Sequence, residues 1–179
     1  VEFYKELCKA FPIISIEDGV ADEQASFEVF FRAEHARLYR TLCMVVGSRE
    51  EAEEIAQDAF LRLWERWNRV SSMEAPTAYL FQVAMNVFRS RYRSTMRAMR
   101  RTLAQRPDED AFAAIEDRDV VVRLLKGLTT QQRAAVVLTN LVGYSSEEAG
   151  RLLKMPPGTV RALSTRARAA MKETAGERP

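Results

Sequence analysis

Residues 145–173 read SSEEAGRLLKMPPGTVRALSTRARAAMKE, and this stretch decides how the rest of the chain is interpreted. Ser145, followed three residues later by Glu148, is a capping pair that starts a helix. That helix is short, because the two prolines and the glycine of residues 155–158 interrupt it before a second helix begins. Two helices joined by a tight turn are typical of a helix-turn-helix.

The second of these helices has two unlike faces. At about 100° per residue, one sector is apolar and holds Val160, Leu163, Ala167 and Met171. The opposite half is basic and small, with Arg161, Ala162, Thr165, Arg166, Arg168, Ala169 and Lys172. Such a face suits the DNA major groove, where arginines contact phosphates or guanine edges. It is also the pattern of an ordinary amphipathic helix with a solvated basic face, and this helix alone leaves both interpretations open.

The remainder of the chain predicts an all-α protein. Outside PIISI, residues 12–16, β-branched alternation is nearly absent, whereas apolar residues recur at helical spacing. Helices are expected over residues 26–46, 49–67, from Pro76 onward, 120–125, 131–142 and 145–154, with Gly47 and Gly143 as stops. We expect two small helical domains, residues 23–99 and 118–174, joined by a charged linker at 100–117. Residues 1–22 form an unassigned N-terminal extension and residues 175–179 a tail.

The helix from Pro76 combines a core stripe with a polar face. The stripe is Leu80, Val83, Ala84, Val87 and Phe88; the polar face is Gln82, Asn86, Arg89 and Arg93, with Tyr79 and Tyr92 off the apolar centre. Aromatic rings, amides and arginines together are the usual means of binding single-stranded or distorted nucleic acid. A solvated face with tyrosines as rim packing is the alternative. Residues 75–107 favour nucleic acid, because they contain seven arginines and no acid.

The helix expected at residues 49–67 is acidic on its outer face. The side away from its core stripe shows Glu54, Gln57, Asp58, Leu61 and Glu65, with Trp64 at the edge. Leucine and tryptophan among acids form a poor DNA surface and a plausible protein-binding patch. Packing of Leu61 and Trp64 against a neighbouring helix explains the same residues equally well.

Three segments in this order resemble bacterial RNA polymerase sigma factors of the extracytoplasmic-function group. GSREEAEEIAQDAFLRLWERW, residues 47–67, is similar to the family's segment that binds the clamp helices of the largest polymerase subunits. APTAYLFQVAMNVFRSRYR, residues 75–93, resembles the segment that melts and reads the promoter minus-ten element. LTTQQRAAVVLTNLVGYSSEEAGRLLKMPPGTVRALSTRARAAM, residues 128–171, resembles the helix-turn-helix that reads the minus-thirty-five element.

The resemblance implies a role for each set of residues. Asn86 stands where the family has an asparagine that helps capture a flipped promoter base. The minus-ten candidates are therefore Gln82, Asn86, Arg89 and Arg93. The minus-thirty-five candidates are Thr159, Arg161, Ala162, Thr165, Arg166 and Arg168, and the polymerase-binding candidates are Gln57, Asp58, Leu61 and Trp64.

The sequence also departs from the family. Tyr79 replaces a usual tryptophan, Met85 a usual arginine, and ALSTRAR a common SRLSRAR, so promoter preference does not transfer. Lys154 stands at a turn position that is often glycine, and Pro157 at one that is often apolar. Residues 3–19, FYKELCKAFPIISIEDG, instead resemble a short segment of enolase, but a lone Glu17 does not make a metal site.

The amino-acid composition argues against several classes of function. Two cysteines without a CxxC pair and a single histidine predict neither a disulfide framework nor a zinc site, and no cofactor or metal is assigned. We expect that the protein is not an enzyme, that it does not insert directly into a membrane, and that it is located in the cytoplasm of a bacterium. The expected partners are core RNA polymerase, promoter DNA and, from the resemblance, an anti-sigma factor that could hold the protein at the membrane. The alternative is a stand-alone helix-turn-helix regulator that binds duplex DNA without polymerase.

Overall fold

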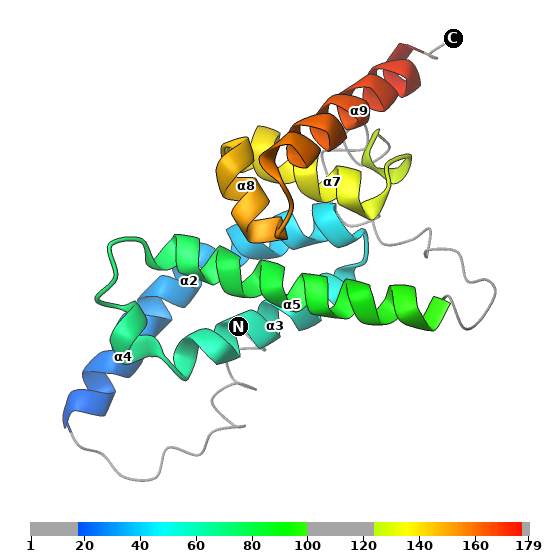
Figure 1. The fold of residues 1–179 in the computed structure, drawn as a ribbon. Coiled ribbons are helices and arrows are strands. Elements are labelled where there is room, and N and C mark those ends of the chain that lie inside the picture. The colour runs from blue at the N-terminus through cyan, green and yellow to red at the C-terminus, as the bar shows by residue number, and fades with distance from the viewer. Residues whose placement is uncertain (1–17, 100–123, 177–179) are drawn as a thin grey trace.

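A computed structural model describes residues 18–99 and 124–176 of the 179-residue chain, with the side chains of the first range described over 22–97. Within these ranges every regular element is helical, so the all-α prediction is confirmed (Figure 1). The N-terminal unit contains α2 (Asp18–Val46), α3 (Arg49–Trp64), α4 (Trp67–Val70) and α5 (Pro76–Met99). The C-terminal unit contains α7 (Thr130–Val136), the π-helical turn η1 (Val137–Leu141), α8 (Ser146–Leu153) and α9 (Pro157–Gly176).

The N-terminal unit packs α3 between α2 and α5 around an aromatic and aliphatic core. Phe60 is fully buried, and its ring centroid lies 4.7 Å from that of Phe31 on α2. The predicted stop at Gly47 is confirmed, because its φ of 78° is a conformation that glycine adopts without strain. The hydroxyl of Ser48 then caps α3 by accepting from the backbone N–H of Glu51.

Two predicted boundaries in this unit are wrong. Helix α2 begins at Asp18, eight residues before the expected helix start at residue 26. The helix expected over 49–67 ends at Trp64, because Arg66 leaves helical geometry (φ −129°, ψ 16°) before α4 starts. This break turns Trp67 inward, where its indole N–H donates to the hydroxyl of Ser26 at 2.7 Å. Residues 1–17 and the expected linker at 100–117 lie outside the described residues.

Capping boxes, in which a side chain and a backbone group at each end of the pair bond reciprocally, mark the starts of α7 and α8. The predicted Ser145–Glu148 capping box is confirmed: the serine hydroxyl accepts from the N–H of Glu148, whose carboxylate accepts from the N–H of Ser145. Thr129 and Gln132 form a second capping box at the start of α7. The predicted stop at Gly143 is confirmed by its φ of 90°.

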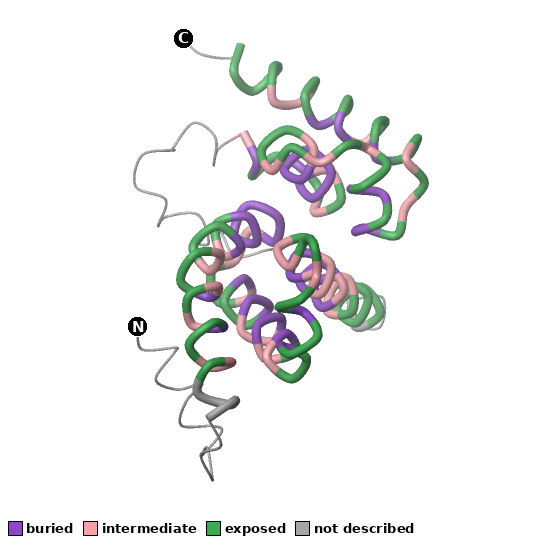
Figure 2. Tube along the Cα trace, turned by 90° about the vertical axis from the view of Figure 1, so that its left-hand side faces the viewer, coloured by how far each residue is buried: buried purple, intermediate pink, exposed green. Residues whose placement is uncertain are grey.

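Helix α9 begins at Pro157, inside the turn, and packs on α7 and α8. Its predicted apolar side faces them: Val160 and Ala167 are buried, and Leu163 and Met171 are half-buried. Ser164 is also buried there, 3.2 Å from the hydroxyl of Thr139. Figure 2 shows the exposed positions of α9 along its outer side.

The turn between α8 and α9 carries backbone strain at a lysine. Lys154 has φ 50° and ψ 51°, the left-handed conformation in which a Cβ is unfavourable. We expect Lys154→Gly to stabilise the protein by about 0.5–1 kcal/mol. Glycine relieves the backbone strain, but part of this gain is lost because glycine adds conformational entropy to the unfolded chain. Urea unfolding measures the net gain, with Lys154→Ala as the matched control. An equal gain from alanine, which keeps the Cβ, would contradict a backbone cause.

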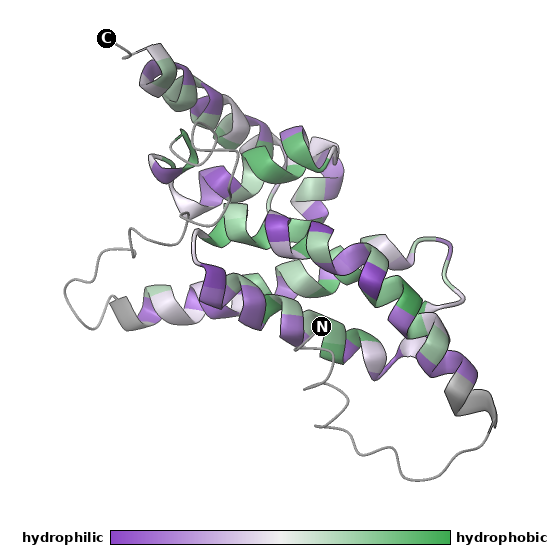
Figure 3. Ribbon diagram, turned by 180° about the vertical axis from the view of Figure 1, so that it is seen from behind, coloured by the Kyte–Doolittle hydropathy of each residue, from purple (hydrophilic) through white to green (hydrophobic). Residues whose placement is uncertain are grey.

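The two units are packed against each other. Helix α7 lies on α2, and α8 lies on α5 (Figure 1). The tyrosine ring of Tyr144 meets Phe81 of α5 edge to face, with centroids 6.0 Å apart. This explains why Phe81 and Met85, outside the predicted stripe, are fully buried, while the stripe residue Val83 is only half-buried. Hydrophobic positions gather on the inner sides of the helices in Figure 3.

Candidate nucleic-acid and protein interfaces

The predicted polar face of α5 exists and is organised around Asn86. Arg89 donates from Nη1 to the side-chain oxygen of Asn86 at 2.8 Å, and Arg93 donates from Nε to the backbone oxygen of Arg89 at 3.3 Å. Because Arg89 occupies the amide oxygen, the NH₂ group of Asn86 keeps its two donors for other partners. Burial and the neighbouring Arg93 lower the pKa of Arg89, which stays cationic at any physiological pH.

A small cavity opens beside this face, between α5 and the end of α3. Its volume is about 190 Å³, and its wall is formed by Arg62, Glu65, Arg66, Tyr79, Gln82, Val83 and Asn86. Arg66 donates from Nη1 to the phenol oxygen of Tyr79 at 3.3 Å, which fixes the two at the edge of the cavity. The contribution of Arg62 and Arg66 was missed by sequence reasoning, because only the packing of α3 on α5 brings them to Asn86.

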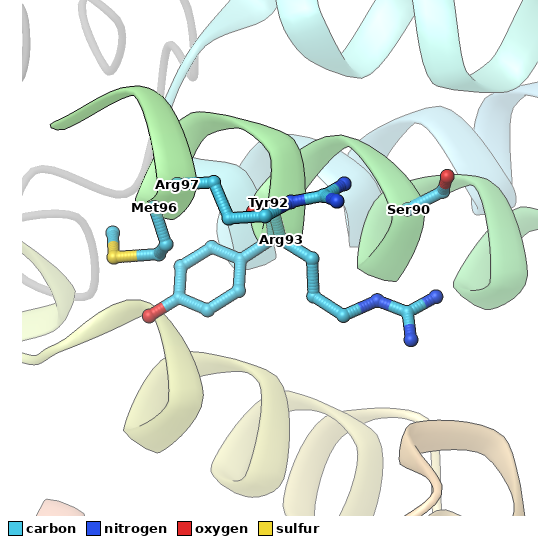
Figure 4. Close-up of a pocket in the computed structure, with 5 residues that line it drawn as sticks. All are labelled: Ser90, Tyr92, Arg93, Met96 and Arg97. Atoms are coloured by element: carbon cyan, nitrogen blue, oxygen red, sulfur yellow. Dashed lines mark hydrogen bonds between the residues drawn. The ribbon is translucent and has the colours of Figure 1, made fainter. Parts of the chain in front are cut away.

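The distal half of α5 lines a second, larger hollow of about 530 Å³. Ser90, Tyr92, Arg93, Met96 and Arg97 form its described wall, and Tyr92 and Arg93 point toward the C-terminal unit in Figure 4. Gln82 and Asn86 therefore face one hollow and Arg93 another, so the four predicted minus-ten residues follow one side of α5 without sharing a single pocket.

The arginines of α5 are not all available for a polyanion. Arg91 is paired with two acids of α3, through Nη2 to Asp58 at 2.9 Å and through Nη1 to Glu54. The bond to Asp58 is the main cause that raises the pKa of Arg91. Residues 75–107 contain no acid of their own, but their described part is helical from Pro76 to Met99, and Arg91 is neutralised by acids of α3.

The four candidate residues on α3 are half-buried. Gln57, Asp58, Leu61 and Trp64 lie along one side of the helix, and Leu61 and Trp64 pack partly on the core. The indole of Trp64 lies 4.9 Å from the Phe27 ring of α2, so the packing interpretation accounts for part of this tryptophan. What remains accessible is a mixed acidic and apolar strip, to which Arg91 contributes the positive charge beside Asp58.

The predicted basic face of α9 is fully presented to solvent. Arg161, Ala162, Thr165, Arg166 and Arg168 are all exposed, and so are Thr159, Ala169 and Lys172. Arg161 pairs with Glu147 of α8 at 3.0 Å, with 60% and 57% of the two side chains exposed. Exposed pairs contribute little stability, so Arg161 exchanges Glu147 for another anion at low cost. The face can therefore bind DNA without rearrangement of the helix.

Comparison with known proteins agrees with this arrangement. Residues 30–98 match Sigma-70 region 2, and residues 118–171 match Sigma-70, region 4. SigM of Mycobacterium tuberculosis, an ECF RNA polymerase sigma factor, is 30% identical over 158 residues, covering 88% of this chain and 81% of SigM. The sigma-E factor of Streptomyces coelicolor is 30% identical over 153 residues, covering 84% and 86%.

Two solved structures share the fold. The sigma factor RpoE of Bartonella quintana, in complex with the anti-sigma factor NepR, has a TM-score of 0.65 at 21% identity, covering 86% of this chain and 99% of that one. CnrH, in complex with the cytosolic domain of CnrY, has a TM-score of 0.58 at 23% identity, covering 87% and 91%.

A helical region 2 followed by a helix-turn-helix region 4 defines a sigma factor of the sigma-70 class. This chain belongs to the extracytoplasmic-function group of RNA polymerase sigma factors. Its function is that of the group, which is to direct RNA polymerase to promoters and initiate transcription. The stand-alone regulator is not favoured. None of the described helices is both long enough and apolar enough to cross a bilayer.

Proposed function

We propose that this sigma factor binds core RNA polymerase through the side of α3 that carries Gln57, Asp58, Leu61 and Trp64. It then reads one promoter at two points, the minus-ten element with α5 and the minus-thirty-five element with α9. The observation that carries the proposal is the cavity beside Asn86. A protein that bound only intact duplex would need α9 but would not need a hollow on the face of a second helix, α5.

The cavity suits one unstacked base. Its volume of about 190 Å³ is below the range of about 300–1,000 Å³ that drug-sized ligands occupy, so a single flat ring system is the proposed occupant. The NH₂ group of Asn86 offers two donors to the edge of the base, while Tyr79 offers an aromatic surface. Arg62, Arg66 and Arg89 supply positive charge for the backbone that follows the flipped nucleotide.

Helix α9 is proposed to enter the major groove upstream. Thr159, Arg161, Ala162, Thr165, Arg166 and Arg168 all project from its exposed side, and the small Ala162 and Thr165 allow close approach. Arginine is the commonest donor to guanine edges and also binds phosphates. Helix α8, capped by Ser145 and Glu148, supports α9 as the first helix of the helix-turn-helix.

The strip on α3 is proposed as the polymerase contact. Leu61 and Trp64 supply apolar surface, and Asp58 supplies an acceptor next to Arg91. The mixture of one acid, one cation and an aromatic ring is typical of protein interfaces and unlike a DNA surface.

The partner that restrains the protein is proposed to be an anti-sigma factor, since the two structures compared above are complexes with a second protein, and one of them is a sigma factor bound to the anti-sigma factor NepR. We also propose that the protein works in the bacterial cytoplasm, where an anti-sigma factor could hold it at the membrane, and that it catalyses no reaction of its own. Its chemistry is recognition, with the polymerase performing synthesis.

A mobility shift with and without core enzyme tests the proposal. A promoter fragment should be retarded strongly only when core polymerase and the protein are both present, because α9 alone offers a single short contact with the duplex. Equally tight, sequence-specific retardation without core enzyme would support the stand-alone regulator instead.

A further inference from the structure

One arginine in the interface between the two units is buried. Arg133 of α7 has 7% of its surface exposed, although arginine is rarely buried unless it is paired. Burial is the main cause that lowers the pKa of its guanidinium, which stays charged. A buried cation must find hydrogen-bond acceptors to replace water, so its partners identify what holds it.

The partners of Arg133 lie on both units. Across the interface, Nε donates to the backbone oxygen of Val45 and Nη2 to that of Val46, both at 3.0 Å. Within its own unit, Nη1 donates to the backbone oxygen of Leu128 at 3.0 Å and Nη2 to the hydroxyl of Thr130 at 3.3 Å. The guanidinium thus bridges the helix-turn-helix unit and the end of α2.

The acceptors on α2 are suited to a cation. Val45 and Val46 are the last residues of that helix, where carbonyl groups lack partners within the helix and the helix dipole is negative. Arg133 therefore acts as a C-terminal cap for α2, supplied by a helix about ninety residues further along the chain. The edge-to-face contact of Tyr144 with Phe81 closes the same interface over α5.

In this packed arrangement α5 and α9 are too close together to contact the two elements of one promoter at the same time. Helix α5 packs on α8, which packs on α9, and packed helices lie about 8–10 Å apart, so near these contacts α5 and α9 lie within about 20 Å. The minus-ten and minus-thirty-five elements are, by their names, about 25 base pairs apart, which is about 85 Å of duplex. Residues 100–123 could span about 80 Å when fully extended, so the covalent link permits separation.

We propose that Arg133 is an interdomain latch, which holds the helix-turn-helix unit on the end of α2 in the free protein and releases it when both promoter elements are bound. The inference rests on the proposed function for its open state, whereas the closed state rests on the contacts of Arg133 and Tyr144 alone. Because the guanidinium and the two carbonyls of α2 regain water on opening, the latch is reversible.

The test measures the distance between the units in the free protein. Spin labels are attached at Ser72→Cys and Glu173→Cys, both exposed, with Cys8 replaced by serine and Cys43 left in place because it is buried. Double electron–electron resonance should give one short distance for this labelled protein. Arg133→Met, which removes the guanidinium, should add a longer population, while Arg69→Met, which removes an exposed arginine of α4, should leave the short distance unchanged.

A second variant keeps the test decisive if Arg133→Met loses helix content by circular dichroism. Tyr144→Ala removes the contact with Phe81 and leaves the bonds of Arg133 in place, so it should also add a longer population. Short distances in every folded variant would overturn the latch. Adding core polymerase together with promoter DNA to the unsubstituted labelled protein should lengthen the distance. Lengthening in the variants but not with polymerase and promoter DNA would retain the latch and count against the proposed function.

Discussion

Asn86→Ala is expected to reduce promoter opening by about 5–150-fold while core polymerase still binds. The substitution removes the two donors that face the cavity and leaves the cavity otherwise intact. A contact with an unstacked base is worth about 1–3 kcal/mol, which corresponds to this loss of open complex. Permanganate footprinting of the melted strand measures opening, and co-migration with core enzyme measures polymerase binding.

Asn86→Asp separates recognition from packing in the same experiment. It has the shape of asparagine and still accepts from Arg89, but it offers acceptors and a negative charge where the amide offered donors. We expect it to open promoters no better than the alanine variant. Asn68→Ala, at an exposed position of α4, is the matched control and should behave as the unsubstituted protein does. Full opening by the aspartate variant would contradict a donor role for Asn86.

Arg161→Ala and Arg166→Ala are expected to weaken binding to the upstream element by about 1–3 kcal/mol each, or about 5–150-fold, if each arginine contacts a base. Both side chains are exposed on the outer side of α9, so their removal leaves the buried Val160 and Ala167 seam intact. Binding of the polymerase complex to promoter variants, titrated at several salt concentrations, measures the effect.

The way in which DNA affinity is lost in these arginine variants shows whether each arginine contacts a base or a phosphate. A base contact should relax specificity at one promoter position, whereas a phosphate contact should weaken all sequences alike and lower the salt slope by about 1. Glu147→Gln frees Arg161 from its ion pair and should not weaken binding. If neither arginine variant changes affinity or salt slope, α9 does not enter the groove with this face.

Local features were predictable because they depend on neighbouring residues. The Ser145–Glu148 cap, the stops at Gly47 and Gly143 and the two faces of α9 each follow from a few consecutive positions or from helical period alone. The polar face of α5 was predictable for the same reason.

Features that depend on distant segments were not predictable. Met85 is buried because the C-terminal unit covers a second side of α5, and Arg91 faces α3, as its two acidic partners show. In the sequence, Arg133 resembles any arginine on the surface of a helix, because no neighbouring residue indicates that its hydrogen-bond acceptors lie on α2. The cavity wall likewise combines Arg66 and Tyr79 from two elements, and only the packed structure brings them together.

Whether the protein directs core polymerase to promoters is measured by run-off transcription with purified core polymerase over a library of promoters. We expect the protein to confer initiation on a subset of promoters that share a minus-ten and a minus-thirty-five sequence, and core polymerase alone to give none of these transcripts. Transcripts that are equally abundant with and without the protein, or that show no shared promoter sequence, would contradict this expectation.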